Sequence, residues 1–374
     1  MNPLTTPLLL VESLPGHSNL FYGSGFSAHD PVVFLDTPKR KLLVVPLLEV
    51  GRAAAACPGI DVLTPDDLPL DPKHKRHLSE WALALLRHAS IAAVLVPSYF
   101  PVAVADCLRK AGINVKVANG PIYPRREIKT DAEIALLRAS QRAAVKAMKE
   151  AIRVIADTSI RRDGVLIWKR DVLTSERLRT VVDQTLLSEK CVANETILAC
   201  GPHAADPHER GSGPLRARES IVLDIFPRHK ATGYWGDITR TVVRGRARPE
   251  LKSFYRAVAA AQKLALSLIR PGITGSDVHT AVKEYFDHQG FPMRVEGSIV
   301  RGFFHGTGHG IGLDVHEAPS LSPAGGPLQP GHVVTVEPGL YDPDIGGVRI
   351  EDVVVVTSDG CRILATCPKP FELV

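Results

Sequence analysis

The sequence predicts a protein of two domains, an α/β domain over residues 1–125 followed by an α+β domain over residues 126–374. Three observations support this prediction. The chain has 374 residues, which is more than one hydrophobic core usually serves, since a domain typically contains about 100–200 residues. Strand-like and helix-like segments alternate in the first third of the chain. In the remainder, long helical segments precede an end that is rich in strands.

Short apolar runs alternate with helical segments in the first domain, which is the order of a small α/β sheet domain. The following segment, residues 120–130, contains two prolines and a charge run but no apolar period, so it is predicted to be a linker. The predicted elements are strands at 31–36, 41–46, 91–98 and 114–119, and helices near 78–89 and 101–111.

A long helix is predicted directly after the linker. Thr130 and Glu133 have the spacing of a capping box at its start. Two further helices are predicted, over 249–270 with a stop at Pro271 and Gly272, and over 276–289 with a stop at Gly290. The apolar residues that recur close to helical spacing in the long helix are Ile134, Leu137, Val145, Met148, Ile152 and Ile155.

Composition excludes several classes of protein. The net charge is +5, but the Lys and Arg residues are scattered among 40 acids, so no basic face for nucleic acid is predicted. No apolar run approaches the ~18–20 residues of a membrane span, and the N-terminus lacks a basic region and is broken by prolines. The six cysteines form no CxxC pair, so neither a disulfide framework nor a thiolate zinc site is indicated. We therefore expect a cytoplasmic protein that binds neither nucleic acid nor membrane.

Two predicted hairpins each carry two acids. Asp224 interrupts the apolar strand at 220–226, and Asp237 follows after the turn. Alternation along residues 233–243 places Asp237 on the same strand face as two threonines. Near the C-terminus, Glu337 and Glu351 recur in the same arrangement on either side of a turn. The separations of 13 and 14 residues suggest two equivalent hairpins that face each other.

Four carboxylates buried together would repel one another and lose hydration, so such a group requires cations. Two divalent ions would balance the four charges. Any one of these acids could equally be an ordinary residue at a strand end, and that alternative stays open for each. Three histidines, His305, His309 and His316, lie between the hairpins in a glycine-rich segment. This segment does not fit a phosphate loop, so its glycines are better explained as allowing close approach to a ligand.

With these residues in order, the sequence resembles the pita-bread metallopeptidases, and specifically their Xaa-Pro branch of prolidase and aminopeptidase P. The similarity spans roughly 120–374, and residues 18–53 resemble the smaller creatinase-type domain of this branch. The resemblance implies a creatinase-like α/β domain followed by an α+β pita-bread catalytic domain. The motifs that carry it are "GDITRT", "HGTGHGIGLDVHE", "VEPGLY" and "GGVRIED".

The resemblance also implies a set of metal ligands. Asp224 would bind one divalent ion, Asp237 and Glu351 would bridge two ions, and His309 and Glu337 would complete the shell of the second ion. Glu337 would in addition accept a proton from the bridging water. Carboxylates with one imidazole and no thiolate suit manganese, which we expect first, with cobalt or zinc as alternatives.

Four further residues match positions that contact substrate in this family. His208 and His316 resemble histidines that hold the substrate and stabilise the tetrahedral intermediate. His305 and Arg349 resemble residues near the end of the site that recognises proline. Strand alternation independently places Arg349 on the same face as Glu351.

The expected reaction is hydrolysis of the Xaa-Pro peptide bond in a proline-containing peptide by a metal-bridging water. An Xaa-Pro dipeptidase and an Xaa-Pro aminopeptidase both remain open, and the resemblance suggests a homodimer. The alternatives are a non-catalytic peptide-binding protein on the same fold, which should have lost ligands, or a hydrolase of another small amide. Methionine aminopeptidase shares the ligands but would not need the preceding domain.

Two features bear on substrate choice. We hypothesise that an apolar recess for the proline ring includes members of the group Tyr234, Trp235, Phe303 and Phe304, with core packing as the open alternative. Phe226 stands where the family usually has glycine, and the turn between Asp224 and Asp237 is longer than usual. We therefore expect the rim of the cleft to be altered.

Overall fold

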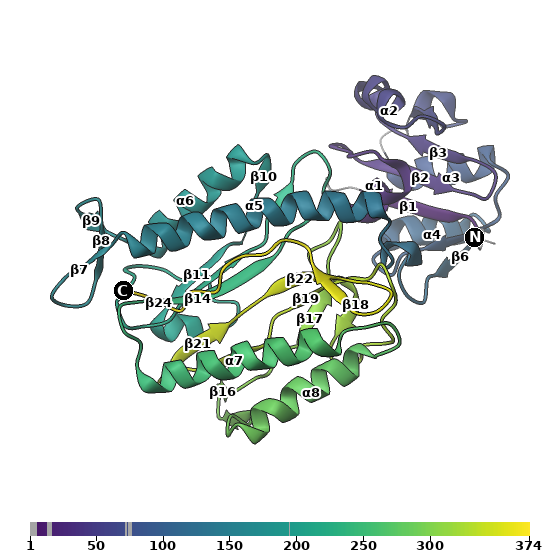
Figure 1. The fold of residues 1–374 in the computed structure, drawn as a ribbon. Helices are drawn as coiled ribbons and strands as arrows, with labels where there is room; N and C mark the ends of the chain where they lie inside the picture. The colour runs from purple at the N-terminus through teal and green to yellow at the C-terminus, as the bar shows by residue number, and fades with distance from the viewer. Residues whose placement is uncertain (1–5, 13–16, 72, 74–76, 194) are drawn as a thin grey trace. The chain divides into compact units, whose positions relative to one another are not determined.

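The computed structural model describes residues 6–12, 17–71, 73, 77–193 and 195–374. The chain forms two compact units, Met1–Pro124 and Arg125–Val374. The first is an α/β unit and the second an α+β unit, so the predicted fold classes are confirmed (Figure 1). Parts of the N-terminal segment used above to expect a cytoplasmic protein, residues 1–5 and 13–16, lie outside the described residues.

The first unit contains a six-stranded mixed sheet in the order β4-β3-β2-β1-β5-β6. Strand β2 pairs antiparallel with β1 and β3, whereas β5 pairs parallel with β1 and β6. The strands are β1 Leu8–Glu12, β2 Val32–Asp36, β3 Lys41–Val44, β4 Asp61–Leu63, β5 Ala93–Val96 and β6 Asn114–Val117, and the α-helices are α1 Ser18–Ser24, α2 Val50–Ala56, α3 Leu78–His88 and α4 Val102–Lys110.

Both faces of this sheet are covered. In β2, Val33 and Leu35 pack with residues of α3 and α4, while Val32 and Phe34 pack with residues of α1 and α2. Burial on both faces explains why β2 is a continuous apolar run without polar alternation. The predicted strands and helices of the first unit are all present, whereas β1, β4, α1 and α2 were not predicted.

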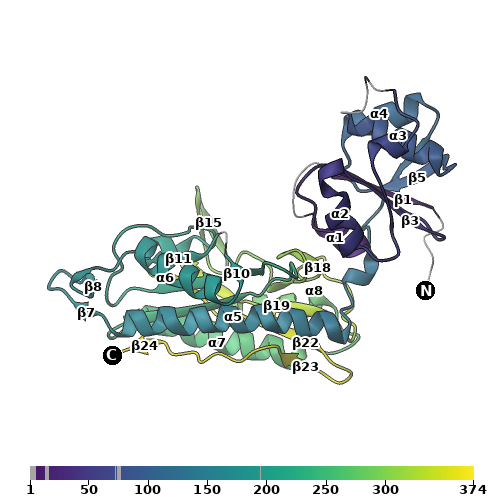
Figure 2. The ribbon, with the colours of Figure 1, turned by 90° about the horizontal axis from the view of Figure 1, so that it is seen from above.

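Four long helices enclose the strands of the second unit, with α5 and α6 on one side and α7 and α8 on the other (Figures 1 and 2). The capping box at the start of α5 is confirmed, since the Thr130 hydroxyl accepts from Glu133 N and the Glu133 carboxylate accepts from Thr130 N. Helix α7 ends three residues before the predicted stop at Pro271, and α6 was not predicted. The bounds are α5 Asp131–Ala156, α6 Ser175–Ser188, α7 Pro249–Leu268 and α8 Gly275–His288.

Two sheets form the centre of this unit. One has the order β11-β12-β14-β24 and the other β18-β17-β19-β22-β23. Smaller sheets pair β20 with β21, β15 with β16, β10 with β13, and β7 and β9 with β8. The strands are β7 Ser159–Ile160, β8 Leu166–Trp168, β9 Asp171–Val172, β10 Cys191–Val192, β11 Ile197–Cys200, β12 Ile221–Ile225, β13 Arg228–His229, β14 Ile238–Arg244, β15 Arg294–Glu296, β16 Ile299–Arg301, β17 Gly308–Gly310, β18 Glu317–Leu321, β19 Val333–Val336, β20 Gly339–Asp342, β21 Gly346–Arg349, β22 Asp352–Val356, β23 Cys361–Ile363 and β24 Glu372–Leu373.

The two predicted hairpins are present, and their acids lie inside or beside the strands. Strands β12 and β14 pair antiparallel with Asp224 opposite Thr239, and Asp237 directly precedes β14. In the second hairpin β19 pairs with β22 and β20 with β21. Glu337 lies in the break between β19 and β20, and Glu351 lies in the break between β21 and β22. Neither residue is part of a regular strand.

The predicted linker is wrong in its second half. Lys129 is 5% exposed, and its backbone N donates to Gly331 O at 2.9 Å, so this part of the segment packs into the second unit. Two of its charged residues, Arg126 and Lys129, pair with Glu317, and the prediction missed this because it equated charge with exposure to solvent. In the part of the chain that the structure describes, no helix has both the length and the apolar character needed to span a membrane.

Candidate metal centre

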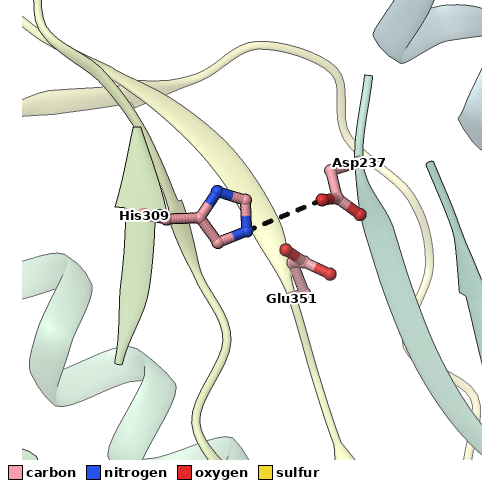
Figure 3. A group of neighbouring side chains, drawn as sticks. All are labelled: Asp237, His309 and Glu351. Atoms are coloured by element: carbon pink, nitrogen blue, oxygen red, sulfur yellow. Dashed lines mark ion pairs between the residues drawn. The ribbon is translucent and has the colours of Figure 1, made fainter. Parts of the chain in front are cut away.

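All nine site residues predicted from the sequence line one cavity of about 600 Å³ in the second unit. The acids and His309 come from separate parts of the fold: Asp224 from β12, Asp237 from the residue before β14, His309 from β17, and Glu337 and Glu351 from the breaks in the second hairpin. Figure 3 shows Asp237, His309 and Glu351 converging from three separate segments of the chain. The residues of this cavity that were predicted are Asp224, Asp237, His309, Glu337, Glu351, His208, His305, His316 and Arg349.

The carboxylates and the imidazole lie within reach of a shared cation. One ligand atom each from Asp237, His309 and Glu351 lies within 4.8 Å of the other two. His309 Nε2 is 3.3 Å from Glu337 Oε1 and 3.8 Å from Asp237 Oδ2. Asp237 and Glu351 are 4% and 1% exposed, so the group lies inside the protein.

Burial and mutual repulsion disfavour the charged forms of these acids. Burial, followed by the charges of Glu351 and Asp224, holds the pKa of Asp237 well above its usual value. Burial and the charges of Glu337 and Asp224 do the same to the pKa of Glu351. Burial raises the pKa of Glu337 to about 7, with a further contribution from Asp224. Without a cation, this arrangement therefore opposes ionisation.

Unpaired oxygens indicate where a cation fits. Asp224 Oδ1, Asp237 Oδ1 and Glu351 Oε1 are buried and accept no hydrogen bond from any described residue. Buried polar atoms are usually satisfied, and three unsatisfied carboxylate oxygens in one cavity leave lone pairs suited to a divalent ion. The donor set of oxygens and one imidazole nitrogen, without a thiolate, fits a hard or borderline divalent ion.

Buried polar side chains hold the acids in place. The Gln141 side chain accepts from Asp237 N at 2.8 Å and donates to Asp237 O at 2.6 Å, which fixes this peptide against α5. Thr239 Oγ1 donates to Glu351 Oε2 at 2.7 Å, and Thr335 Oγ1 donates to Glu337 Oε1 at 3.2 Å. Gln141 was not predicted, although it occupies the apolar stripe of α5 four residues after Leu137 and four before Val145.

Arg349 connects the acids to His305. Its Nη2 donates to Asp224 Oδ2 at 2.7 Å, and its Nη1 donates to Tyr341 Oη at 2.9 Å. Tyr341 Oη lies 2.9 Å from His305 Nε2, and His305 Nδ1 lies 2.8 Å from Gly306 O. Burial lowers the pKa of His305 to about 3, so this imidazole is neutral near pH 7. Both ring nitrogens make hydrogen bonds, so a ligand can contact His305 only through the face and the carbon atoms of its ring.

The remaining predicted residues are placed differently. His316 packs edge-on against His309 with ring centroids 4.2 Å apart, and His208 is exposed where its loop borders the cavity. Of the four aromatics proposed for a recess, only Phe304 lines this cavity. Phe303 and Tyr234 are buried in the protein interior, and Trp235 Nε1 donates to Leu313 O. Phe226, directly after β12, also lines the cavity.

The loop that carries His316 is fixed by buried charges. Lys129 Nζ lies 2.7 Å from Glu317 Oε1, and Arg126 Nη2 pairs with Glu317 and Asp314. The side chain of Lys129 is 1% exposed. Because Glu317 directly follows His316, these two cations from the segment before α5 restrict where that imidazole can lie.

Comparisons with known proteins agree with this geometry. Residues 135–358 match the family model of metallopeptidase family M24. An uncharacterised peptidase of Bacillus subtilis is 34% identical over 241 residues, which cover 63% of this chain and 64% of that protein, less than two thirds of its length. A Xaa-Pro dipeptidase of Pyrococcus horikoshii is 29% identical over 92% of this chain and 90% of its own. The solved structure of a Xaa-Pro dipeptidase from Bacillus anthracis superposes with a TM-score of 0.82 at 25% identity, covering 98% of this chain and 95% of that one.

Proposed function

Because this chain belongs to metallopeptidase family M24, we propose that it hydrolyses the peptide bond between an N-terminal residue and proline with two divalent ions. The observation that carries this proposal is the group of buried carboxylates with unpaired oxygens around His309. The names of the relatives from Pyrococcus horikoshii and Bacillus anthracis support the choice of the Xaa-Pro bond. A role limited to binding would not require five potential ligands to be retained.

Five side chains would hold the ions: Asp224, Asp237, His309, Glu337 and Glu351. Asp237 and Glu351 would serve both ions, Asp224 the first, and His309 and Glu337 the second. Manganese is the proposed native ion, with cobalt and zinc as alternatives that suit the same donors. Ions bound there would lower the pKa of a water and polarise the scissile carbonyl.

Glu337 would accept the proton of the attacking water. Its carboxylate lines the cavity and its Oε1 lies 3.3 Å from His309 Nε2, so it is within reach of a water held among the ligands. His316, beside His309, and His208, at the border of the cavity, would donate hydrogen bonds to the oxygen on which charge develops. The buried links to Gln141 and Thr239 keep the acids in position before substrate arrives.

The proline ring would lie against His305 and Phe304. His305 presents a ring whose nitrogens are both engaged in hydrogen bonds, and Phe304 lies beside it with ring centroids 6.4 Å apart. The nitrogen of a prolyl amide carries no hydrogen, so it needs no hydrogen-bond acceptor and can lie in an apolar recess. We also propose a homodimer, which light scattering of the purified chain would test.

Hydrolysis of Leu-Pro and Leu-Pro-Leu by metal-stripped protein refilled with manganese, cobalt or zinc tests the proposed function. We expect cleavage that depends on added metal and is lost in Asp237→Asn, which removes a bridging carboxylate. Asp61→Asn, at an exposed position of the first unit, is the matched control and should retain cleavage. Cleavage that survives both chelation and Asp237→Asn would contradict the proposal.

A further inference from the structure

A second cavity of about 300 Å³ adjoins the one that holds the acids. Asp206, Pro207 and Phe304 line both cavities, so the two share a wall. The second cavity is otherwise lined mainly by apolar side chains, among them Ile299 and Val300 of β16. The hairpin of β15 and β16 projects from the second unit at this point (Figure 2).

The charges around the two cavities do not favour a carboxylate in the substrate. Arg349 is the one permanently cationic side chain among the described residues that line either cavity. It is 3% exposed, and its charge is paired with Asp224 at 2.7 Å. Asp206, by contrast, is exposed on the shared wall, and its Oδ1 accepts from the backbone N of His208 at 3.0 Å.

Neutral groups complete the polar lining of the first cavity. The hydroxyls of Ser320 and Ser322 lie 2.8 Å apart and both residues line it. The charges of Asp224, Asp237, Glu337 and Glu351 would balance two divalent ions. The remaining charges, those of Arg349 and Asp206, are equal and opposite. No net positive charge is then left to bind the C-terminal carboxylate of a dipeptide.

We propose that the second cavity binds the residue after proline, so that the protein is an aminopeptidase for peptides of the form Xaa-Pro-Yaa and longer. This inference rests on the proposed function, in which the proline ring lies against Phe304. Since Phe304 also lines the second cavity, a chain that continues past proline enters it. A Xaa-Pro dipeptide would instead place its carboxylate near Asp206. Water adds across the Xaa-Pro bond, with hydroxyl to the carbonyl carbon and a proton to the ring nitrogen, releasing Xaa and a peptide that begins with proline.

Three substrates separate the effect of charge from the effect of the second cavity: Leu-Pro, Leu-Pro amide and Leu-Pro-Leu amide. We expect kcat/KM to rise by about tenfold from Leu-Pro to its amide, because the carboxylate near Asp206 is removed, and to rise again for the tripeptide amide, which fills the second cavity without adding a carboxylate. Among the products, prolyl-leucine amide should inhibit more strongly than prolinamide, which measures binding without turnover. Equal or faster cleavage of Leu-Pro would overturn the inference, while cleavage of none of the three would overturn the proposed function as well.

Two variants test the assigned residues. Asp206→Arg should raise kcat/KM for Leu-Pro relative to Leu-Pro-Leu amide by about tenfold, because it supplies the missing cation. Glu209→Arg reverses a charge three residues away, outside both cavities, and should leave this ratio unchanged. Ile299→Trp should fill the second cavity and lower kcat/KM for Leu-Pro-Leu amide but not for Leu-Pro amide. A ratio that does not respond to Asp206→Arg, or that responds equally to Glu209→Arg, refutes the role of Asp206.

Discussion

Raising the pH should destabilise the metal-free second unit. The pKa of Glu337 is about 7 in the folded chain, against 4.5 for an unperturbed glutamate carboxyl. Because the folded pKa is the higher one, the folded chain retains a proton that the unfolded chain releases between these values. The stability from this group is complete below pH 4.5 and is lost as the pH rises through 7. The shift corresponds to about 3 kcal/mol, and Asp237 and Glu351 shift in the same direction.

Urea denaturation of chelator-treated protein at pH 5 and pH 8 measures this effect. Trp81 is the one tryptophan of the first unit, so fluorescence of a Trp81→Phe variant reports the second unit through Trp168 and Trp235. This separation matters because buried Glu12 in the first unit also has a pKa of about 7, raised by burial. We expect the free energy of unfolding to fall by at least about 3 kcal/mol from pH 5 to pH 8.

Two controls complete this experiment. Glu337→Gln should reduce the pH-dependent loss by about 3 kcal/mol, because it removes the titrating group. With saturating manganese the dependence should reverse, since the ligands bind metal only after losing their protons. Metal-free wild-type protein that is equally stable or more stable at pH 8 than at pH 5 would refute the reasoning.

Three substitutions test the supporting structure. Arg240→Met should lower the free energy of unfolding by about 3–5 kcal/mol, because Arg240 is 1% exposed and pairs with buried Asp352. Arg362→Met, at an exposed position, is the control and should change it little. Equal effects of the two substitutions in urea titrations would refute the prediction. Lys129→Met should lower kcat by about tenfold with KM unchanged. In a protein that already carries His316→Ala, the same substitution should lower kcat no further. Additive losses of kcat would show that Lys129 does not act through His316. Gly347→Ala should lower the free energy of unfolding by at least about 2 kcal/mol, since the new Cβ would overlap the carbonyl oxygen of Ala204. Gly360→Ala is the control, because a Cβ at Gly360 would meet open space. Similar melting temperatures for the two variants would contradict the prediction.

Asp224 and Glu351 could be predicted because each one interrupts an apolar run of the sequence. Asp224 in "SIVLDIF" and Glu351 in "VRIEDVVVV" are conspicuous where burial on both faces favours Val and Ile. The paired separations then indicated that the two hairpins carry equivalent acids. The strand alternation was less informative about Glu337 and Glu351, because both lie in breaks of the ladder where the two-residue period no longer applies.

The residues that hold the site were harder to predict because their partners are distant in the sequence. Gln141 binds the Asp237 peptide across 96 residues, and Arg126 binds Glu317 across 191. Lys129 was assigned to a linker because it is charged, although Glu317 compensates its burial. Of the four aromatics named for a recess, only Phe304 lines the cavity, for a related reason: Phe303 and Phe304 lie outside regular strands, so periodicity could not determine which ring faces the cavity.

The central claim is that Asp224, Asp237, His309, Glu337 and Glu351 form one site for two divalent ions. An anomalous difference map from a crystal grown with manganese, measured near the manganese absorption edge, tests it most directly. The account predicts two peaks about 3.5–4 Å apart among these five side chains, with Asp237 and Glu351 contacting both. A map with no peak among these residues, or with a single ion that Asp237 does not contact, would contradict it.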